Sequence, residues 1–204
     1  MNPMIFCMVP YLSFYDGTEE EQLPEGMNFL PIALSDDGVS RELLFGALHG
    51  KSQLPIEKIT SDEDLSSGFV SGVTVVFCAK AENGSLVTVG WYKNANVTHT
   101  PEILPCENED GSPCDHPFFF CARAEEAVLL PEDTRFETKW AIPRNKSKAA
   151  GKYGFSADSL WLADEPAAKL WKENFAGQIA SYDGDNWLDE DDTAETDDGP
   201  DSED

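Results

Sequence analysis

The chain has 204 residues, of which 41% are hydrophobic and 11% aromatic, enough for one domain with a substantial core. No segment reaches the roughly 18 uninterrupted apolar residues of a membrane-spanning helix, so we expect no membrane partner. The formal net charge of -25 disfavours any class of protein that holds nucleic acid through a broad basic surface.

The negative charge is unevenly distributed along the chain. Twelve of the 39 acidic residues lie in 183–204, which has no Lys or Arg, so 1–182 hold 27 acids and all 14 bases. A segment so charged cannot bury enough apolar surface to fold, which predicts a domain over 1–182 and a disordered acidic tail over 183–204. One stretch, 139–152, carries five cations and no acid. It would be the docking site of a polyanion, or else a solvated loop that offsets the acidic surplus.

The N-terminal part begins with an apolar run. Residues 4–15 are predicted to form a buried strand that ends at the Asp16-Gly17 turn. This run has no basic n-region and no A-x-A-like cleavage site, so we interpret it as a core strand instead of a signal peptide. Together with an odd number of cysteines, this favours a reducing intracellular compartment, cytoplasmic or nuclear. Residues 18–42 are predicted to lack regular structure, and 43–48 to form a short strand or helical turn.

The middle of the chain gives the clearest local prediction. Residues 73–80 and 86–92 are short, apolar and β-branched, and Asn83-Gly84 between them is a strong hairpin signal. Gly90 within the second strand indicates a bulge or a close approach of another backbone.

The remaining elements are predicted from apolar runs between turn residues. They are a loop at 101–117, strands at 117–124, 127–130 and 136–142, a short apolar piece at 159–162 and a helix at 164–179. Several strands with one or two helices and no βαβ alternation predict an α+β fold around a small mixed β-barrel.

The sequence contains no pattern typical of a catalytic or metal centre. It has no nucleophile elbow, no phosphate-binding glycine loop and no metalloprotease helix. Cys106, Cys114 and His116 follow a C-x7-C-x-H spacing that matches no common zinc site. We therefore predict no catalytic residue, no metal and no cofactor, and a protein that is not an enzyme.

Residues 88–97, T-V-G-W-Y-K-N-A-N-V, are close to a V-G-W-Y-K-N-A-x-V signature, and I-P-R at 142–144 and S-L-W at 159–161 follow in the same order. The chain thereby resembles a mostly microbial family that looks related to the PUA-like superfamily, which includes the EVE, YTH and ASCH domains. The resemblance implies a small β-barrel that reads modified or flipped bases in an aromatic-lined pocket. The turn at 156–159 departs from the family's pattern.

The resemblance also implies which residues would form that pocket. Their roles would be two stacking walls, a hydroxyl, a contact to the base edge and cations facing phosphate. Trp91 and Trp161 would be the stacking walls, and Tyr92 or Tyr153 would supply the hydroxyl. Asp158 or Ser159 would contact the base edge, and Lys93 with Arg144 would face phosphate.

Functions of different classes stay open at this point. The first is a non-enzymatic binding module for a modified or flipped base, with nucleic acid or a nucleotide as its partner. The second is an acidic interaction protein that binds a basic protein partner or mimics DNA through its negative surface and tail. A small hydrolase would need an acid/base pair in a cleft, which sequence alone does not locate.

Overall fold

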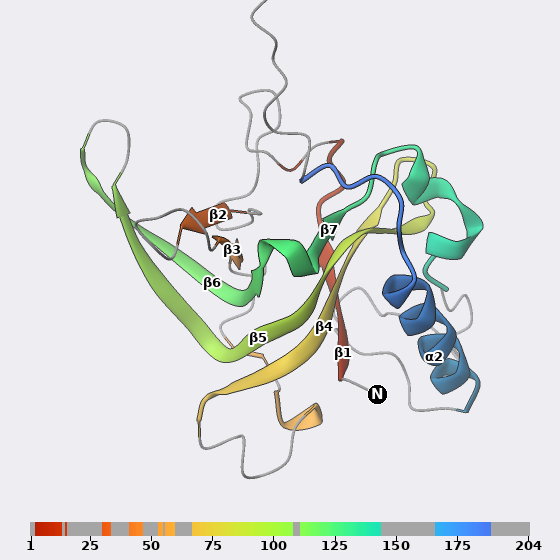
Figure 1. The fold of residues 1–204 in the computed structure, drawn as a ribbon, viewed down its shortest axis with the longest axis horizontal. Coiled ribbons are helices and arrows are strands. Elements are labelled where there is room, and N and C mark those ends of the chain that lie inside the picture. Colours follow the sequence, from red (N-terminus) through yellow and green to blue (C-terminus); the bar gives the residue numbers. More distant parts are fainter. Residues whose placement is uncertain are drawn as a thin grey trace, which may run out of the picture.

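A computed structural model describes residues 3–13, 15, 30–33, 41–46, 53–54, 56–59, 67–107, 111–143 and 166–188. The described part is a mixed sheet with one α-helix (Figure 1). Its strands are β1 (Met4–Val9), β2 (Leu30–Ala33), β3 (Arg41–Gly46), β4 (Phe69–Lys80), β5 (Leu86–Glu107), β6 (Pro113–Arg123) and β7 (Ala127–Leu129). Its helices are the 3₁₀ turns η1 (Ile56–Lys58), η2 (Ala124–Glu126), η3 (Thr134–Phe136) and η4 (Thr138–Trp140), and α2 (Pro166–Ala180).

The seven strands form one sheet in the order β1-β4-β5-β6-β3-β2, with β7 also paired to β5. β1 runs parallel to β4, and the other pairs are antiparallel. The pairings within the described chain include none between the end strands β1 and β2. The β-rich fold with helical additions is therefore confirmed, whereas closure into a PUA-like barrel stays a prediction.

The predicted β4–β5 hairpin is confirmed, and its turn residues explain it. Gly84 has a φ of 81°, a conformation that favours glycine, and its N–H donates to Ala81 O at 2.9 Å. The Asn83 side chain accepts hydrogen bonds from the N–H and the hydroxyl of Ser85. At Gly90 an added Cβ would lie 3.2 Å from Leu129 Cα, and the register of β4 shifts beside it. The close backbone approach inferred from this glycine is therefore present, and the approaching strand is β7.

The loop predicted at 101–117 is wrong over most of its length. β5 continues to Glu107 and β6 begins at Pro113, so the two strands form a long hairpin directed away from α2 (Figure 1). Pairing of β5 with β4 ends at Thr98, so one edge of β5 is not paired with β4 beyond that residue. Proline is tolerated on such an edge because no ladder hydrogen bond needs its missing N–H. Pro101 and Pro105 therefore do not end the strand.

The strand predicted at 136–142 is also wrong, because this segment forms the 3₁₀ turns η3 and η4. The Asp133 carboxylate accepts the Thr134 N–H at 2.8 Å and starts η3. In η4 the Trp140 N–H donates to Glu137 O at 2.9 Å, and only Ala141 then forms a bridge, with Val87. Local capping overrides the strand-like alternation of the sequence.

The N-terminal and C-terminal elements match the predictions more closely. β1 covers the first half of the predicted strand and ends before Pro10. β2 lies within 18–42, where no regular structure was expected, and β3 overlaps the predicted element at 43–48. α2 confirms the helix predicted at 164–179, with Pro166 at its first position. None of the described helices has the length and hydropathy that a membrane crossing needs.

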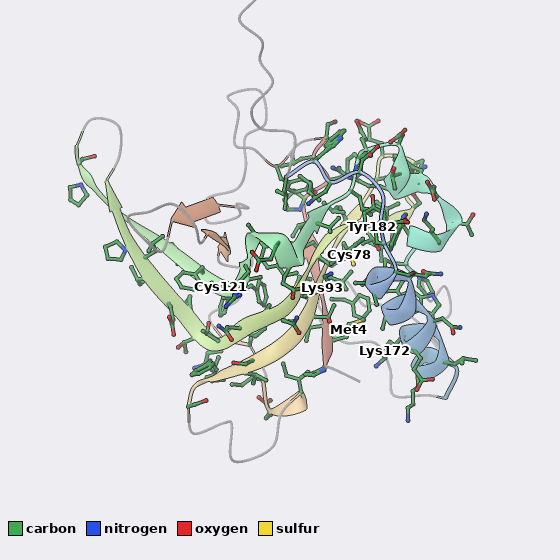
Figure 2. All side chains as sticks on the ribbon, viewed as in Figure 1. Met4, Cys78, Lys93, Cys121, Lys172 and Tyr182 are labelled. Atoms are coloured by element: carbon green, nitrogen blue, oxygen red, sulfur yellow. The ribbon has the colours of Figure 1, made fainter. Side chains whose placement is uncertain are left out.

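The two faces of the sheet bury two separate cores, because successive side chains of a strand point to opposite faces. Val75 and Phe77 belong to the larger core, whereas Val76 and Cys78 face the other side. Phe175 and Ile179 of α2 close this second core. Its partly buried side chains include Met4 and Tyr182, which lie between the sheet and α2 (Figure 2).

Candidate functional site

Two residues of the predicted aromatic pocket, Trp91 and Tyr92, face opposite sides of the sheet. Trp91 is completely buried in the second core, where its ring stacks on Trp140 with centroids 5.0 Å apart. Tyr92 is completely buried in the larger core, edge-on to Phe77 at 4.9 Å. Adjacent residues of one strand cannot face the same pocket. In this structure neither ring presents a face to a ligand.

Lys93 is partly exposed, and its ammonium lies 3.7 Å from the Glu126 carboxylate. The other residues of the predicted pocket lie outside the described residues. They are Arg144, Tyr153, Asp158, Ser159 and Trp161. A base-binding pocket that includes them stays a prediction, and the described residues contribute no open wall to it.

A cleft of about 540 Å³ opens elsewhere on the domain. Three segments that are distant in sequence form it: the chain after β1, the β4–β5 turn, and the chain from Glu132 to the end of η3. The lining residues are Tyr11, Leu12, Ser13, Ala81, Glu82, Asn83, Glu132 and Phe136. The cleft was not predicted from the sequence, since no local motif links positions so far apart. Its only local signal was the Asn83-Gly84 turn.

Two aromatic rings and a carboxylate form one wall of the cleft. The rings of Tyr11 and Phe136 lie 6.2 Å apart, and Phe136 is 47% exposed. The Tyr11 hydroxyl donates a hydrogen bond to Glu132 Oε1 at 3.0 Å. Burial, followed by this hydrogen bond and the negative charge of Glu132, raises the pKa of Tyr11 to about 12, although Arg135 partly opposes the shift. The phenol therefore stays protonated at neutral pH.

Arg135 lies behind this wall and is completely buried. Its guanidinium donates to Leu130 O at 2.8 Å, to Leu12 O at 2.6 Å and to Ser13 O at 2.9 Å. Aromatic rings surround the same group, with their centroids 5.4 to 6.0 Å from its carbon. They belong to Tyr11, Tyr15 and Trp187. Arg135 thus ties the cleft wall at 11–13 to the C-terminal segment.

The C-terminal segment 183–188 packs on the outer edge of β7. The Asn186 side chain accepts the Leu129 N–H at 2.9 Å and donates to Ala127 O at 3.2 Å, and the Trp187 N–H donates to Leu129 O at 2.9 Å. A side-chain amide has the same donor and acceptor as a peptide group, so Asn186 continues the hydrogen bonding of the sheet. The disorder predicted from residue 183 is therefore wrong for 183–188, and 189–204 lie outside the described residues.

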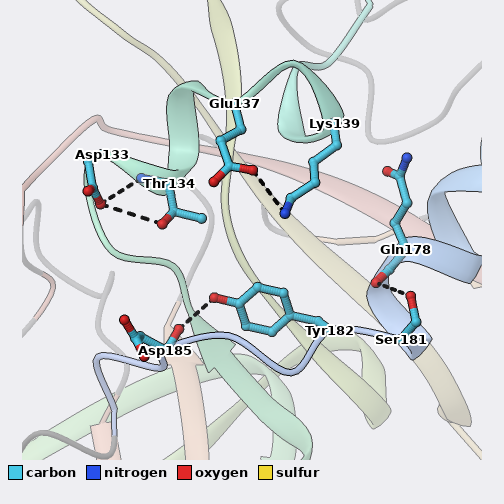
Figure 3. Close-up of polar contacts among 8 residues, drawn as sticks. All are labelled: Asp133, Thr134, Glu137, Lys139, Gln178, Ser181, Tyr182 and Asp185. Carbon is cyan, nitrogen blue, oxygen red and sulfur yellow. Dashed lines mark hydrogen bonds and ion pairs between the residues drawn. The ribbon is translucent and has the colours of Figure 1, made fainter.

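An acidic patch links this segment to the cleft. We define it by six carboxylates, those of Glu82, Glu132, Asp133, Glu137, Asp183 and Asp185. Burial, and then the charges of Asp185, Glu137 and Asp183, raise the pKa of Tyr182. Figure 3 shows Glu137 and Asp185 near this ring, whose hydroxyl donates to the Asp185 main-chain oxygen at 2.6 Å. Glu137 pairs with Lys139 at 2.9 Å. No cation lies within ion-pair distance of the other five among the described residues.

The chemistry available at the cleft is the binding of a positive charge, because carboxylates and aromatic rings both attract cations. No group of three or more potential metal ligands occurs among the residues that the structure describes. Comparison with protein-family models, with curated proteins and with solved structures finds no match for this chain. Geometry and charge are therefore the properties from which a function can be inferred.

Proposed function

We propose that this chain is a non-enzymatic interaction protein of a reducing intracellular compartment, and that it binds a basic protein partner through the acidic patch. A net charge of -25 attracts a cationic partner at long range and accelerates the encounter. The same charge repels the phosphate backbone of nucleic acid. A basic protein is the partner that this potential favours.

One observation carries the proposal: Asn186 and Trp187 pack on β7. Asp183 and Asp185 belong to this anchored segment, and their charges act on Tyr182 together with that of Glu137, which comes from a distant part of the chain. Carboxylates held close together repel one another, and a cationic partner relieves that repulsion. A partner can therefore gain more from this patch than from the same number of scattered acids.

The test compares two variants with the same net charge. The patch variant carries Glu82→Gln, Glu132→Gln, Asp183→Asn and Asp185→Asn. It leaves Asp133 intact, because that side chain caps η3. The control variant neutralises four exposed acids outside the patch, Glu57, Glu102, Glu125 and Glu173. The ligand is an arginine-rich peptide, titrated by fluorescence anisotropy at about 0.1 M and about 1 M salt, where the Debye length falls from roughly 10 to roughly 3 Å.

We expect the patch variant to bind about tenfold more weakly at the lower salt concentration, since each of its four exposed pairs contributes about 0.2–1 kcal/mol. The control variant should lose less than about threefold, and high salt should weaken all complexes. Equal losses in the two variants would mean that net charge alone attracts the peptide, and the proposed role of the patch would be wrong.

The PUA-like resemblance supports a second candidate, a module that binds a modified base. The observation in its favour is that the indole N–H groups of Trp91 and Trp140 are buried with no hydrogen-bond partner among the described residues. An unpaired buried donor is costly, and the acceptor atoms of a base would satisfy it once the side chains that cover both indoles had moved apart. A screen of modified and unmodified oligonucleotides tests this candidate. Binding should be lost in Trp91→Phe, and absence of binding to every oligonucleotide would reject it.

A further inference from the structure

We infer that the cleft between Tyr11, Phe136, Glu82 and Glu132 binds the guanidinium group of an arginine side chain. This inference rests on the proposed function, because it names the group that the basic partner inserts. It also makes a narrower claim, since a partner can bind the acidic patch without filling the cleft.

The size of the cleft suits a small group. Its volume of about 540 Å³ lies within the range of roughly 300–1,000 Å³ typical of small-molecule sites. Glu82 and Asn83 come from the β4–β5 turn, whereas Glu132 and Phe136 come from the opposite wall near η3. A side chain that enters between the walls meets a carboxylate on each side.

The charge of the cleft selects a cation. Neither Glu82 nor Glu132 has an ion pair among the described residues, and Glu132 Oε2 has no hydrogen-bond partner there. The positive charge of Arg135 lies behind Tyr11 and is held on main-chain carbonyls. Within the described part of the chain, two carboxylates line the cleft and one buried cation lies behind it, which gives a net negative charge that repels anions and attracts cations.

The rings favour a guanidinium over an ammonium group. A guanidinium is planar and weakly hydrated, so that it stacks on an aromatic face while it donates to a carboxylate. An ammonium is a compact and strongly hydrated charge that gains less from the ring. Phe136 offers a ring that is nearly half exposed, and Glu132 of the same cleft has one carboxylate oxygen without a hydrogen-bond partner in the part of the chain that the structure describes. Inside the protein the Arg135 guanidinium also lies against the Tyr11 ring, although the three hydrogen bonds that hold it go to main-chain carbonyls and not to a carboxylate.

The experiment uses the full chain and three small ligands that differ in one property each. Nα-acetyl-arginine amide carries the guanidinium, Nα-acetyl-citrulline amide has the same shape without charge, and Nα-acetyl-lysine amide carries an ammonium. NMR titration should show that the arginine ligand shifts the signals of Tyr11 and Asn83, that the lysine ligand binds more weakly, and that citrulline has no effect. Shifts of the same size with citrulline would overturn the inference.

Single substitutions then test the contacts. Glu132→Gln keeps a hydrogen-bond acceptor for Tyr11 but removes the charge, and should weaken arginine binding at least about tenfold. Glu82→Gln should weaken arginine binding too. Among the described residues Glu82 has no hydrogen bond or ion pair that this substitution would also remove. Phe136→Leu should cost about threefold through the lost ring. Glu57→Gln is the matched control, an exposed acid outside the cleft, and should bind like the unmodified chain.

The outcomes separate this inference from the proposed function. If the arginine-rich peptide binds with strong salt dependence but Glu132→Gln and Phe136→Leu behave like Glu57→Gln, the inference is wrong and the proposed function stands. If the small arginine ligand occupies the cleft while the peptide fails to bind, the proposed function alone is wrong. If neither ligand binds, both are wrong.

Discussion

Two groups of aromatic side chains in this protein have opposite characters. The first, which we call the closed cluster, consists of Trp91, Trp140, Phe175 and Tyr182 between the sheet and α2. The second is the ring pair of the cleft, Tyr11 and Phe136. Both bring together rings that are distant in sequence, so aromatic content does not distinguish them.

What distinguishes the two groups is exposure and charge. Trp91 and Trp140 are fully buried, and they lie against other rings and aliphatic side chains. Phe136 is 47% exposed, and the Tyr11 hydroxyl binds the Glu132 carboxylate. A ring surrounded by apolar atoms stabilises the fold, whereas a ring that shares an open surface with a carboxylate can bind a ligand. The two groups should therefore respond differently to substitution.

The largest expected effect is on stability, in the closed cluster. Trp140→Ala removes a buried ring that contacts Trp91, Phe175 and Tyr182, and should lower the free energy of unfolding by about 3–5 kcal/mol. The control, Phe136→Ala, removes a half-exposed ring and should cost less than about 1.5 kcal/mol. Urea denaturation measures both values. Equal losses would remove the contrast between the closed cluster and the cleft.

The next effect concerns the buried cation behind the cleft. In Arg135→Lys a single ammonium replaces a planar group that serves three carbonyls, so at least one carbonyl loses its partner and the ring contacts weaken. We expect a loss of about 2–4 kcal/mol. Hydrogen exchange should also accelerate at the Trp187 N–H, because the C-terminal segment packs on the same group. The control is Arg123→Lys, which changes an exposed side chain. If the free energy of unfolding fell as little in Arg135→Lys as in Arg123→Lys, the structural role of Arg135 would be contradicted.

A smaller effect is expected where β7 approaches β5. Gly90→Ala would place a Cβ against the Val128 carbonyl and 3.2 Å from Leu129 Cα, so β7 must move at a cost of about 1–3 kcal/mol. Gly177→Ala in α2 is the control, because an added Cβ there meets no atom within 4 Å and alanine favours a helix. Calorimetry should show a lower melting temperature for the first variant and an unchanged or higher one for the second. A Gly90→Ala protein as stable as the unmodified chain would refute the close approach.

The same contrast explains what the sequence could predict. The β4–β5 hairpin and α2 follow from local signals, a turn dipeptide between apolar runs and a helical spacing after Pro166, and both were predicted. The cleft depends on contacts among residues more than 100 positions apart, such as that of Tyr11 with Glu132, and no local pattern indicates it.

Two further errors have physical causes of the same kind. The prolines of β5 lie where its pairing with β4 has ended, which depends on the sheet and not on the residues themselves. Asn186 and Trp187 lie within an acidic segment, and their order comes from β7 and Arg135. The composition of this segment predicted disorder, because composition does not reveal specific contacts such as those with β7 and Arg135.

The smallest expected effect is the pH dependence of the cleft. The pKa of Tyr11 is raised from 10.0 to about 12, so above pH 10 the unfolded chain releases this proton before the folded protein does. The stabilising contribution of Tyr11 is therefore complete below pH 10 and declines as the pH rises toward 12. Tyr11→Phe removes this group, so the free energy of unfolding should fall less steeply in this variant over the same interval. Tyr182 also has a raised pKa and contributes a similar decline to both proteins, so the difference between the two curves isolates Tyr11. Parallel curves would mean that neither burial nor the Glu132 carboxylate raises the pKa of the Tyr11 phenol in solution, and the cleft would then lack the ordered wall on which arginine binding depends.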